Sequence, residues 1–366
     1  MMHHRPNQLR SVILLVIALP LAVGCDDKPG EANGEPQPNG AHVAANDQTV
    51  DSEPMRHEGM CDASGAVSLG NDLFVVANDE DNVLRVYSNK VGGKPISSTD
   101  LTKVLKITPG READFEGATR LGNRVYWMAS HGRSSSGKWD ADRHKFFATT
   151  ITAAGEGAKI EMAGNVYEHL LDDILDSKQH DGLGLAEASR LGEPRVPELN
   201  PKEKGINLEG LTATADGSAL LIGLRNPRPQ GKAIVLRLTN PAAVVDEGKQ
   251  AEFGKPVLLD LGGLGIRSME YSKQFGGYLI SAGHHSREPK FALHLWSGKA
   301  DDTTPKKLAF DRPDGFSTEA IIVYEGRQEV LLLSDDGTVD VDGKKCKDAA
   351  PEKRGFKSMW FKVGEK

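Results

Sequence analysis

Short apolar stretches alternate with turn-forming residues along most of the chain, and the alternation repeats. Each repeat opens with a polar residue, an apolar residue, an acidic or serine residue and a small residue, and a short apolar stretch follows. Brief apolar runs between turn signals predict strands rather than helices. The five repeats start at residues 62, 114, 207, 268 and 317, and their apolar stretches cover residues 73–77, 125–129, 219–223, 278–281 and 330–334.

The segments around these strands complete the pattern. A turn signal such as Asp216-Gly217 separates the two strands of most repeats, and a third apolar stretch follows at 83–87, 233–238 and 291–296. Small antiparallel sheets repeated in this way form a β-propeller. We therefore predict an all-β fold, a β-propeller with five blades, with six blades as the alternative.

One spacing is too long for a single blade. Glu116 and Glu209, the acidic positions of the second and third repeats, are 93 residues apart, whereas the other spacings are 49 to 61 residues. The excess has room for a sixth blade, but residues 166–175 place apolar side chains at helical spacing. Residues 180–204 are rich in Gly and Pro. We therefore predict one inserted helix and a long loop, and such loops often cover a binding site.

The first residues have the pattern of an export signal. Arg5 and Arg10 precede an apolar run at 11–23, which is shorter than the roughly 20 apolar residues of a membrane span. Cys25 follows this run as the acylated cysteine follows a bacterial lipobox. We predict a signal peptide at 1–24 and a lipid on Cys25 that anchors the protein to a membrane of the bacterial cell envelope. An exported protein without a lipid is the alternative.

The anchor leaves the rest of the chain outside the cytoplasm, for example in the periplasm. Residues 25–56 contain the lipidated cysteine and then mainly Pro, Gly, Asn and acidic residues, which cannot bury enough apolar surface to fold. We predict a disordered tether there and a single β-propeller domain at 57–366.

Composition excludes several classes of protein. The 40 Gly and 19 Pro among 366 residues argue against a helix-rich fold. The net charge is -7, from 45 Lys and Arg against 52 Asp and Glu, and becomes about -9 when Arg5 and Arg10 leave with the signal. Nucleic acid is therefore not expected as a partner, and a membrane is expected only through the lipid anchor.

Two cysteines remain after Cys25, at opposite ends of the predicted domain. Cys61 precedes the first repeat and Cys346 follows the last. An exported protein can form disulfides, and a propeller brings its two chain ends together where the ring closes. We predict a Cys61–Cys346 disulfide, with two buried free thiols as the alternative.

The repeats also predict where polar groups gather. The inner strand of every blade lines the central channel, and residues two apart share one face of a strand. The repeats therefore place ten polar side chains around the axis. These are Asp62, Ser64, Asp114, Glu116, Asn207, Glu209, Ser268, Glu270, Ser317 and Glu319.

The ends of the second strands, at residues 78–80, 130–133, 225–226, 283–285 and 334–336, return to the same rim and add acidic and basic residues. Carboxylates suit a divalent cation such as Ca²⁺, and arginines suit a polar or anionic ligand. We assign the metal-binding role to Asp62, Asp114, Glu116, Glu209, Glu270 and Glu319. The predicted ligand-binding residues are Arg133, Arg225, Asn207 and Arg267, and the candidate catalytic bases are His131 and His284. For any single Glu, the alternative is a structural role in which it accepts backbone N–H bonds from the next blade.

Other motifs do not carry chemistry. Residues 132–138 resemble a phosphate-binding loop, but Trp139 stands where Ser or Thr would bind Mg²⁺, and residues 145–150 predict a strand rather than a helix. The Asp-Gly pairs at 336–337 and 342–343 favour hairpin turns over calcium loops. Residues 78–82 are interpreted as a solvated loop.

Several segments resemble an uncharacterised bacterial propeller family, catalogued as domain of unknown function 3616. The resemblance spans roughly residues 60–285 and is carried by segments such as 61–65, 79–87, 126–133, 207–211, 221–227 and 265–271. It implies a propeller-like fold and adds no activity, because none is assigned to the family. The Glu-Gly strand starts are also loosely similar to those of phytase-like esterase propellers, which is a likeness of fold and not of chemistry.

Three functions fit these observations. The first is an envelope-anchored binding module whose axial face holds a small polar ligand or a cation. The second is a metal-dependent hydrolase of phosphoesters or lactones, with His131 or His284 as the general base. The third is a scaffold that docks other proteins through its outer faces.

Overall fold

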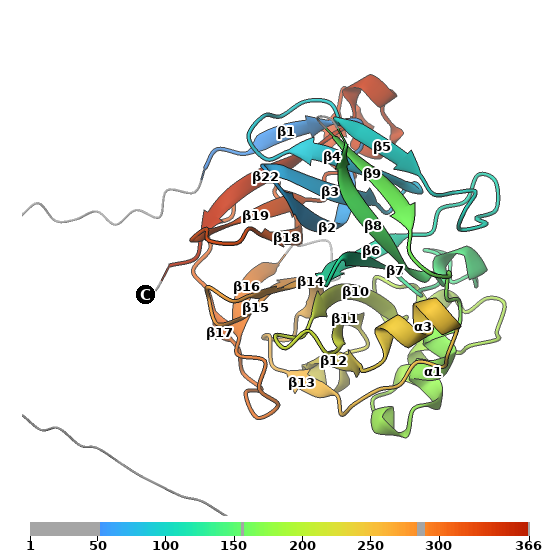
Figure 1. Ribbon diagram of the computed structural model, residues 1–366. Helices are drawn as coiled ribbons and strands as arrows, with labels where there is room; N and C mark the ends of the chain where they lie inside the picture. The colour runs from blue at the N-terminus through green and yellow to red at the C-terminus, as the bar shows by residue number, and fades with distance from the viewer. Residues whose placement is uncertain (1–51, 155–156, 284–289, 365–366) are drawn as a thin grey trace, which may run out of the picture. The chain divides into compact units, whose positions relative to one another are not determined.

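Five four-stranded antiparallel sheets stand around one axis in this computed structural model, which describes residues 52–154, 157–283 and 290–364 (Figure 1). Their inner strands contact one another in a closed cycle, in the order β2, β6, β10, β14, β18 and again β2. A closed cycle of radial sheets is a β-propeller. The prediction of an all-β, five-bladed propeller is confirmed.

Blades 1 to 4 each use four consecutive strands, numbered from the axis outward. Blade 1 contains β2 (Ala63–Gly70), β3 (Leu73–Asn78), β4 (Val83–Ser88) and β5 (Ser97–Asp100). Blade 2 contains β6 (Phe115–Leu121), β7 (Arg124–Ala129), β8 (Phe146–Ala154) and β9 (Gly157–Met162). Blade 3 contains β10 (Asn207–Ala213), β11 (Leu220–Asn226), β12 (Ala233–Leu238) and β13 (Val257–Leu259). Blade 4 contains β14 (Gly265–Ser272), β15 (Gly277–Gly283), β16 (Phe291–Trp296) and β17 (Lys306–Lys307).

Blade 5 joins the two ends of the folded chain. Its order from the axis outward is β18 (Thr318–Val323), β19 (Glu329–Ser334), β22 (Gly355–Lys362) and β1 (Met55–Glu58). Strand β1 pairs with β22 over all four of its residues. It begins at Met55, inside the segment predicted as tether. Between β19 and β22, the small hairpin of β20 (Asp340–Val341) and β21 (Lys344–Lys345) turns at residues 342–343, as the Asp-Gly pair predicted.

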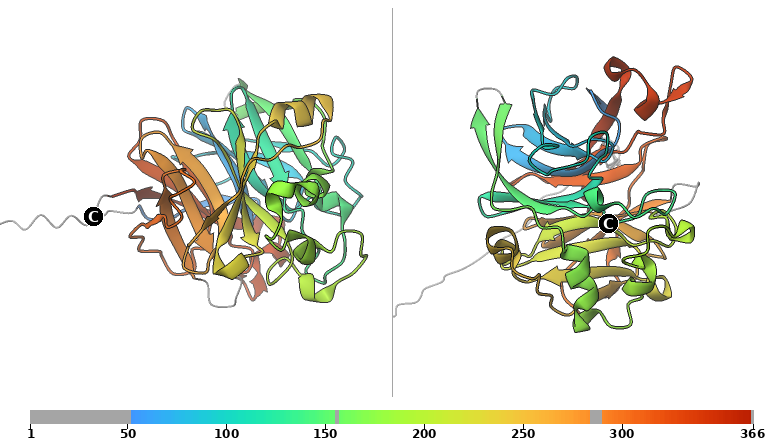
Figure 2. Two further views of the ribbon diagram at one scale, coloured as in Figure 1. Left: turned by 90° about the horizontal axis from the view of Figure 1, so that it is seen from below. Right: turned by 90° about the vertical axis from the view of Figure 1, so that its right-hand side faces the viewer.

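The insertion lies between blades 2 and 3. It contains α1 (Leu170–Asp176) and α2 (Leu185–Ser189), which lie at the periphery of the ring (Figure 2). Helix α1 buries Leu170, Leu171 and Ile174 in the same apolar cluster as α3 (Pro241–Glu247), a further helix between β12 and β13. Within the described residues the gap therefore holds helices and loops and no sixth blade. Short 3₁₀ turns cover Ala141–Arg143, Lys178–His180, Pro197–Leu199, Pro229–Gly231, Cys346–Asp348 and Pro351–Lys353.

The inner strands share an irregularity near their starts. In β6, β10, β14 and β18, the register with the second strand shifts at one residue, which is left without a partner across the sheet as in a β-bulge. These bulge positions are Glu116, Glu209, Arg267 and Glu319. In β2 the shift falls at residues 64–65. The fourth repeat is therefore aligned three residues earlier than we predicted, and Arg267 takes the position that we gave to Glu270.

Close contact between neighbouring inner strands explains the small residue after each bulge. A Cβ on Gly117 would lie 2.8 Å from Leu211 Cβ of β10, and a Cβ on Gly210 would lie 2.7 Å from Ile266 Cγ2 of β14. Real Cβ atoms do not approach so closely, so these positions exclude larger side chains. Farther out, apolar side chains fill the space between blades; Trp127 and Phe147 of blade 2, for example, pack in one cluster with Val75 of blade 1.

The ring is also closed covalently. Cys61 and Cys346 form a disulfide between residues 285 apart in the sequence, as predicted. Both cysteines are buried, and the Asp336 amide beside them donates to the Cys61 carbonyl. Among the described residues, no helix is long and apolar enough to cross a membrane.

We predict that loss of the disulfide destabilises the ring. In the chain-entropy model, cross-linking residues this far apart stabilises a protein by about 5–6 kcal/mol. The double substitution Cys61→Ser and Cys346→Ser should therefore lower the free energy of unfolding by up to about this amount, measured by urea denaturation under non-reducing conditions. An unchanged midpoint, or two free thiols found by mass spectrometry of the wild type, would contradict the prediction.

Candidate functional site

Three glutamates from different blades meet at the axis. One carboxylate oxygen each of Glu116, Glu209 and Glu319 lies within 4.8 Å of the others. Each residue is the bulge residue of its inner strand, so the bulge directs all three side chains to the same place. We call these residues the central triad. Glu209 and Glu319 are buried, and Glu116 is partly exposed.

Two arginines neutralise part of the central triad. Arg267, at the bulge of blade 4, forms ion pairs with Glu319 and, at 3.0 Å, with Glu209 Oε2. Arg225, near the end of β11, places Nη1 2.9 Å from Glu209 Oε1. Glu116 forms no ion pair among the described residues. The triad therefore has one member whose charge no basic side chain contacts.

Burial and mutual repulsion act on these carboxyl groups. Burial raises the pKa of Glu116 well above its ordinary value, and the charges of Glu209 and Asp114 raise it further. The pKa of Glu319 rises to about 7 through burial, although Arg267 opposes the rise. A nearby cation would favour the charged forms of both groups.

A second acidic group lies where blades 1 and 5 meet. Carboxylate oxygens of Asp62, Asp79 and Glu80 lie within 4.8 Å of one another, and we call these residues the closure cluster. Asp335 of blade 5 bridges to Asp62 through the backbone. Lys347 pairs with Glu80. Burial, followed by the charge of Asp335, raises the pKa of Asp62 to about 8.

Asp114 connects the two groups. Its carboxylate lies 2.7 Å from Arg143 Nη1, and the other end of this guanidinium lies 2.7 Å from Glu112. Burial raises the pKa of Asp114, and Arg143 opposes this rise. Asp114 also raises the pKa of both Asp79 and Glu116, so the carboxyl groups from Asp62 to Glu319 form one interacting network.

Some buried acceptors in this network have no donor among the residues that the structure describes. Asn207 is 3% exposed; its Nδ2 donates to Glu209, and its Oδ1 has no hydrogen-bond partner there. Asp79 Oδ1 is likewise buried without a partner. An unmet buried acceptor is costly, so both atoms lie where a ligand that is a cation or a donor would be stabilised.

Not every predicted site residue joins the network. Glu270 lies three residues beyond the bulge of β14, opposite Leu279, and is not part of either group. Burial alone raises its pKa to about 8. Arg133 is 2% exposed and donates to the carbonyls of Ser189, Gly137, Glu193 and Arg190, so it fastens the insertion to blade 2.

Of the two candidate catalytic bases, only His131 lies within the described residues. His131 is 1% exposed, and its Nδ1 donates to the Ala129 carbonyl at 2.8 Å, which leaves Nε2 unprotonated and without a partner. Burial lowers its pKa to about 4, so it is a neutral base enclosed by protein. His284 lies outside the described residues.

Sequence reasoning missed Arg143 and Lys347, which lie far from the repeats. It placed Asp79, Glu80 and Asp335 at the rim as ends of second strands, but gave them no ligand role and interpreted residues 78–82 as a solvated loop. The structure puts Asp79 and Asp335 directly after the second strands of blades 1 and 5, as expected from that position. Both ends of the inner hairpins therefore contribute to the axial face.

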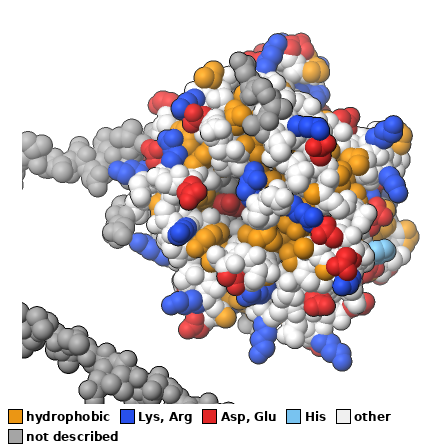
Figure 3. All heavy atoms as spheres, viewed as in Figure 1, with side chains coloured by type: hydrophobic (Ala, Val, Ile, Leu, Met, Phe, Trp, Pro, Cys, Tyr) orange, Lys and Arg blue, Asp and Glu red, His pale blue; other side chains and the backbone are white. Residues whose placement is uncertain are grey.

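The surface of the ring carries charges of both signs (Figure 3). The face of the ring in Figure 3 intersperses acidic and basic side chains, with hydrophobic groups near its middle. It shows no broad basic area of the kind that nucleic-acid binding uses.

Comparisons with solved structures return other proteins that cover most of this chain. Glutaminyl cyclase of Myxococcus xanthus matches at 12% identity and a TM-score of 0.43, covering 86% of this chain and 97% of that one. The PQQ-bound aldose sugar dehydrogenase of Streptomyces coelicolor matches at 12% identity and a TM-score of 0.41, covering 84% and 98%. These values carry no inference about chemistry.

One curated protein matches part of the chain. The trigger factor of Wolinella succinogenes is 27% identical over 175 residues, which are 44% of this chain and 40% of that protein. The chain thus spans about two fifths of the length of this relative. The family described as protein of unknown function (DUF3616) matches residues 159–312, from the outer edge of blade 2 through blade 4, and confirms the family resemblance inferred from the sequence.

Proposed function

We propose that the axial face binds a divalent cation such as Ca²⁺, and that the protein is a binding module for a small polar ligand at this face. The observation that carries the proposal is the convergence of the central triad with a buried, donor-free Asn207 Oδ1 beside it. Ca²⁺ takes six to eight oxygen ligands from carboxylates, amide carbonyls and water. The groups at the axis are of these kinds.

The charge balance of the network supports the same proposal. The central triad, the closure cluster, Asp114 and Asp335 supply eight carboxylates. Among the described residues, four basic side chains contact them, namely Arg225, Arg267, Arg143 and Lys347. Like charges that are close together raise one another's free energy unless a cation compensates. A bound divalent cation would remove part of this repulsion.

We predict that the metal-free protein binds Ca²⁺ and that Glu116→Gln weakens binding at least tenfold, about 1.4 kcal/mol. Isothermal titration of protein carrying Cys25→Ser, which prevents lipid attachment, would measure this. Glu270→Gln is the matched control, because Glu270, like Glu116, is a partly exposed carboxyl on an inner strand but lies outside both groups. Asp79→Asn tests whether the cation instead lies in the closure cluster.

The three variants distinguish a cation in the central triad from one in the closure cluster. A Ca²⁺ affinity lost in Glu116→Gln or Asp79→Asn and kept in Glu270→Gln supports the proposal and names the cluster. Failure to bind any divalent cation, both by titration and by metal analysis of the purified protein, would refute it.

We predict that stability of the metal-free protein, followed by thermal melts at pH 7 and pH 8, falls over this range. The range lies above the pH at which the buried neutral histidines take up protons on unfolding. Asp62, Glu319 and Glu270 have folded pKa values of about 8, 7 and 8, above those of the unfolded chain. The folded state therefore holds more protons in this range, and raising the pH favours unfolding. Ca²⁺ should raise the melting temperature more at pH 8 than at pH 7, because fewer protons compete with it.

Thermal melts at both pH values, with and without Ca²⁺, measure this effect. Glu270→Gln should flatten part of the metal-free decline and leave the Ca²⁺ effect unchanged. A melting temperature of the metal-free wild type that rises from pH 7 to pH 8 would contradict the sign.

We also propose that the protein is exported and held at the envelope by a lipid on Cys25. The disulfide supports this location, since disulfides persist in oxidising compartments. We predict that the mature N-terminus is an acylated Cys25 and that Cys25→Ser moves the protein from the membrane fraction to the soluble one. Mass spectrometry of the N-terminal peptide and cell fractionation test this, and an unmodified mature N-terminus in wild type would exclude the anchor.

A further inference from the structure

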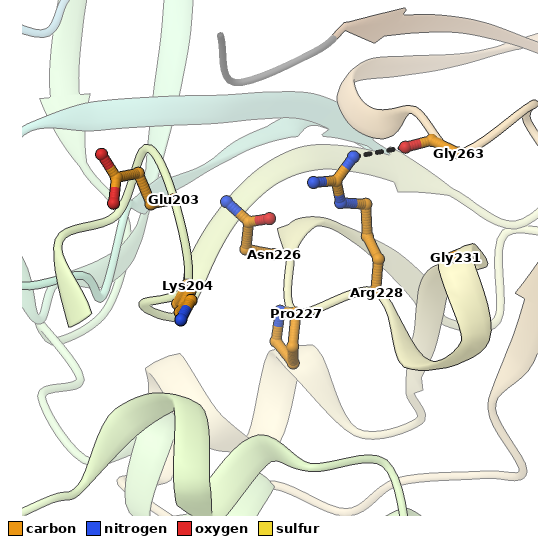
Figure 4. Close-up of a pocket in the computed structure, with 7 residues that line it drawn as sticks. All are labelled: Glu203, Lys204, Asn226, Pro227, Arg228, Gly231 and Gly263. Carbon is orange, nitrogen blue, oxygen red and sulfur yellow. Dashed lines mark hydrogen bonds between the residues drawn. The ribbon is translucent and has the colours of Figure 1, made fainter. Parts of the chain in front are cut away.

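A pocket of about 390 Å³ opens beside the axial network, between blades 3 and 4 and the insertion (Figure 4). Three separate segments form its walls. Glu203 and Lys204 come from the insertion, Asn226 and Arg228 from the end of β11 and the loop after it, and Gly263 from the loop before β14. A volume of this size suits a small organic molecule.

Hydrogen bonds from the lining residues hold these walls together. Asn226 is 2% exposed, and its Nδ2 donates to the Pro201 carbonyl at 2.9 Å, which ties the insertion to β11. Arg228 donates to the Gly263 carbonyl, which ties the loop after β11 to the loop before β14 (Figure 4). The pocket is therefore formed before a ligand enters, so little ordering of these walls opposes binding.

Gly231 and Gly263 form part of the rim of the pocket and are exposed. Both have positive φ, +76° and +80°, which side chains other than glycine rarely adopt. A Cβ on either would meet no described atom within 4 Å, so the rim is open to solvent at these two positions.

The electrostatic character of the pocket is basic. Lys204 and Arg228 line it, and Arg225 is close enough to lower the pKa of Arg228, after burial, through its charge. Lys204 forms no ion pair within the described part of the chain. Among the described lining residues, only Glu203 is acidic, and its carboxylate points away from Arg228 in Figure 4. Guanidinium and ammonium groups around a preformed cavity recognise oxyanions.

We infer that this pocket binds a small organic anion through its carboxylate or phosphate group, with Arg228 and Lys204 as the contacts. The site is separate from the acidic network and does not depend on a cation there. Asn226 and Asn207 are paired across β10 and β11, so the pocket adjoins the central triad through two amide side chains.

Titration calorimetry in metal-depleted buffer tests the inference, with glucuronate, inorganic phosphate and neutral glucose as probes. We expect glucuronate or phosphate to bind at least tenfold more tightly than glucose, and the stronger of the two identifies the oxyanion. Arg228→Gln and Lys204→Gln should each weaken that binding about tenfold, the usual cost of losing one charge-assisted contact. Lys202→Gln is the matched control, because Lys202 is exposed in the same loop and does not line the pocket.

Lys204→Gln also separates a lost contact from a misfolded protein. The Lys204 side chain is exposed and holds no wall of the pocket in place, so this variant is expected to fold. Binding that is equal for glucuronate, phosphate and glucose, or no binding of either anion at 10 mM, roughly the weak limit for a small specific ligand, would overturn the inference. So would full anion affinity in both Arg228→Gln and Lys204→Gln. Because no metal is present, these outcomes are independent of whether the axial network binds Ca²⁺.

Discussion

The crowding of five inner strands around one axis is the constraint on which the rest of this molecule depends. Neighbouring strands approach so closely that Gly117 and Gly210 have no room for a side chain, and the bulge beside each glycine turns a glutamate inward. Crowding therefore forces acidic groups together, and their charges have to be balanced. Arg267 does this for Glu209 and Glu319 and in doing so joins blade 4 to blades 3 and 5.

The same constraint divides the axial face into two parts. Arginines reach blades 3, 4 and 5, whereas Glu116 and the closure cluster of blade 1 are left with fewer basic partners. Structural and ligand-binding roles are thus not alternatives for the whole ring. Glu209, with two arginines, has the surroundings of a structural ion pair, whereas Glu116, without an ion pair among the described residues, is the group on which the proposed cation site depends most.

Much of this could be predicted because the repeats are local in sequence. Turn signals and apolar stretches identified the blades, and the shared Glu-Gly start identified Glu116 and Glu209. The fourth repeat was misaligned because Ser268, Met269 and Glu270 imitate the polar, apolar, acidic order three residues after the true bulge. A search for acidic residues cannot find Arg267, because the bulge of blade 4 holds a basic residue that pairs with Glu209 and Glu319. The closing strand β1 could not be predicted for another reason: its partner β22 lies some 300 residues away in the sequence.

The closure of blade 5 has a mechanical consequence. Any pull on the chain before Met55 acts first on β1, whose backbone pairs with β22 can open one after another. The pull then reaches Cys61, where the disulfide passes part of it to Cys346 in the same blade. Beyond Cys61 the force divides between β2, which follows two residues later in the chain, and blade 5, to which the disulfide connects directly. Two blades therefore share a load that, without the disulfide, would pass along the backbone into blade 1 alone.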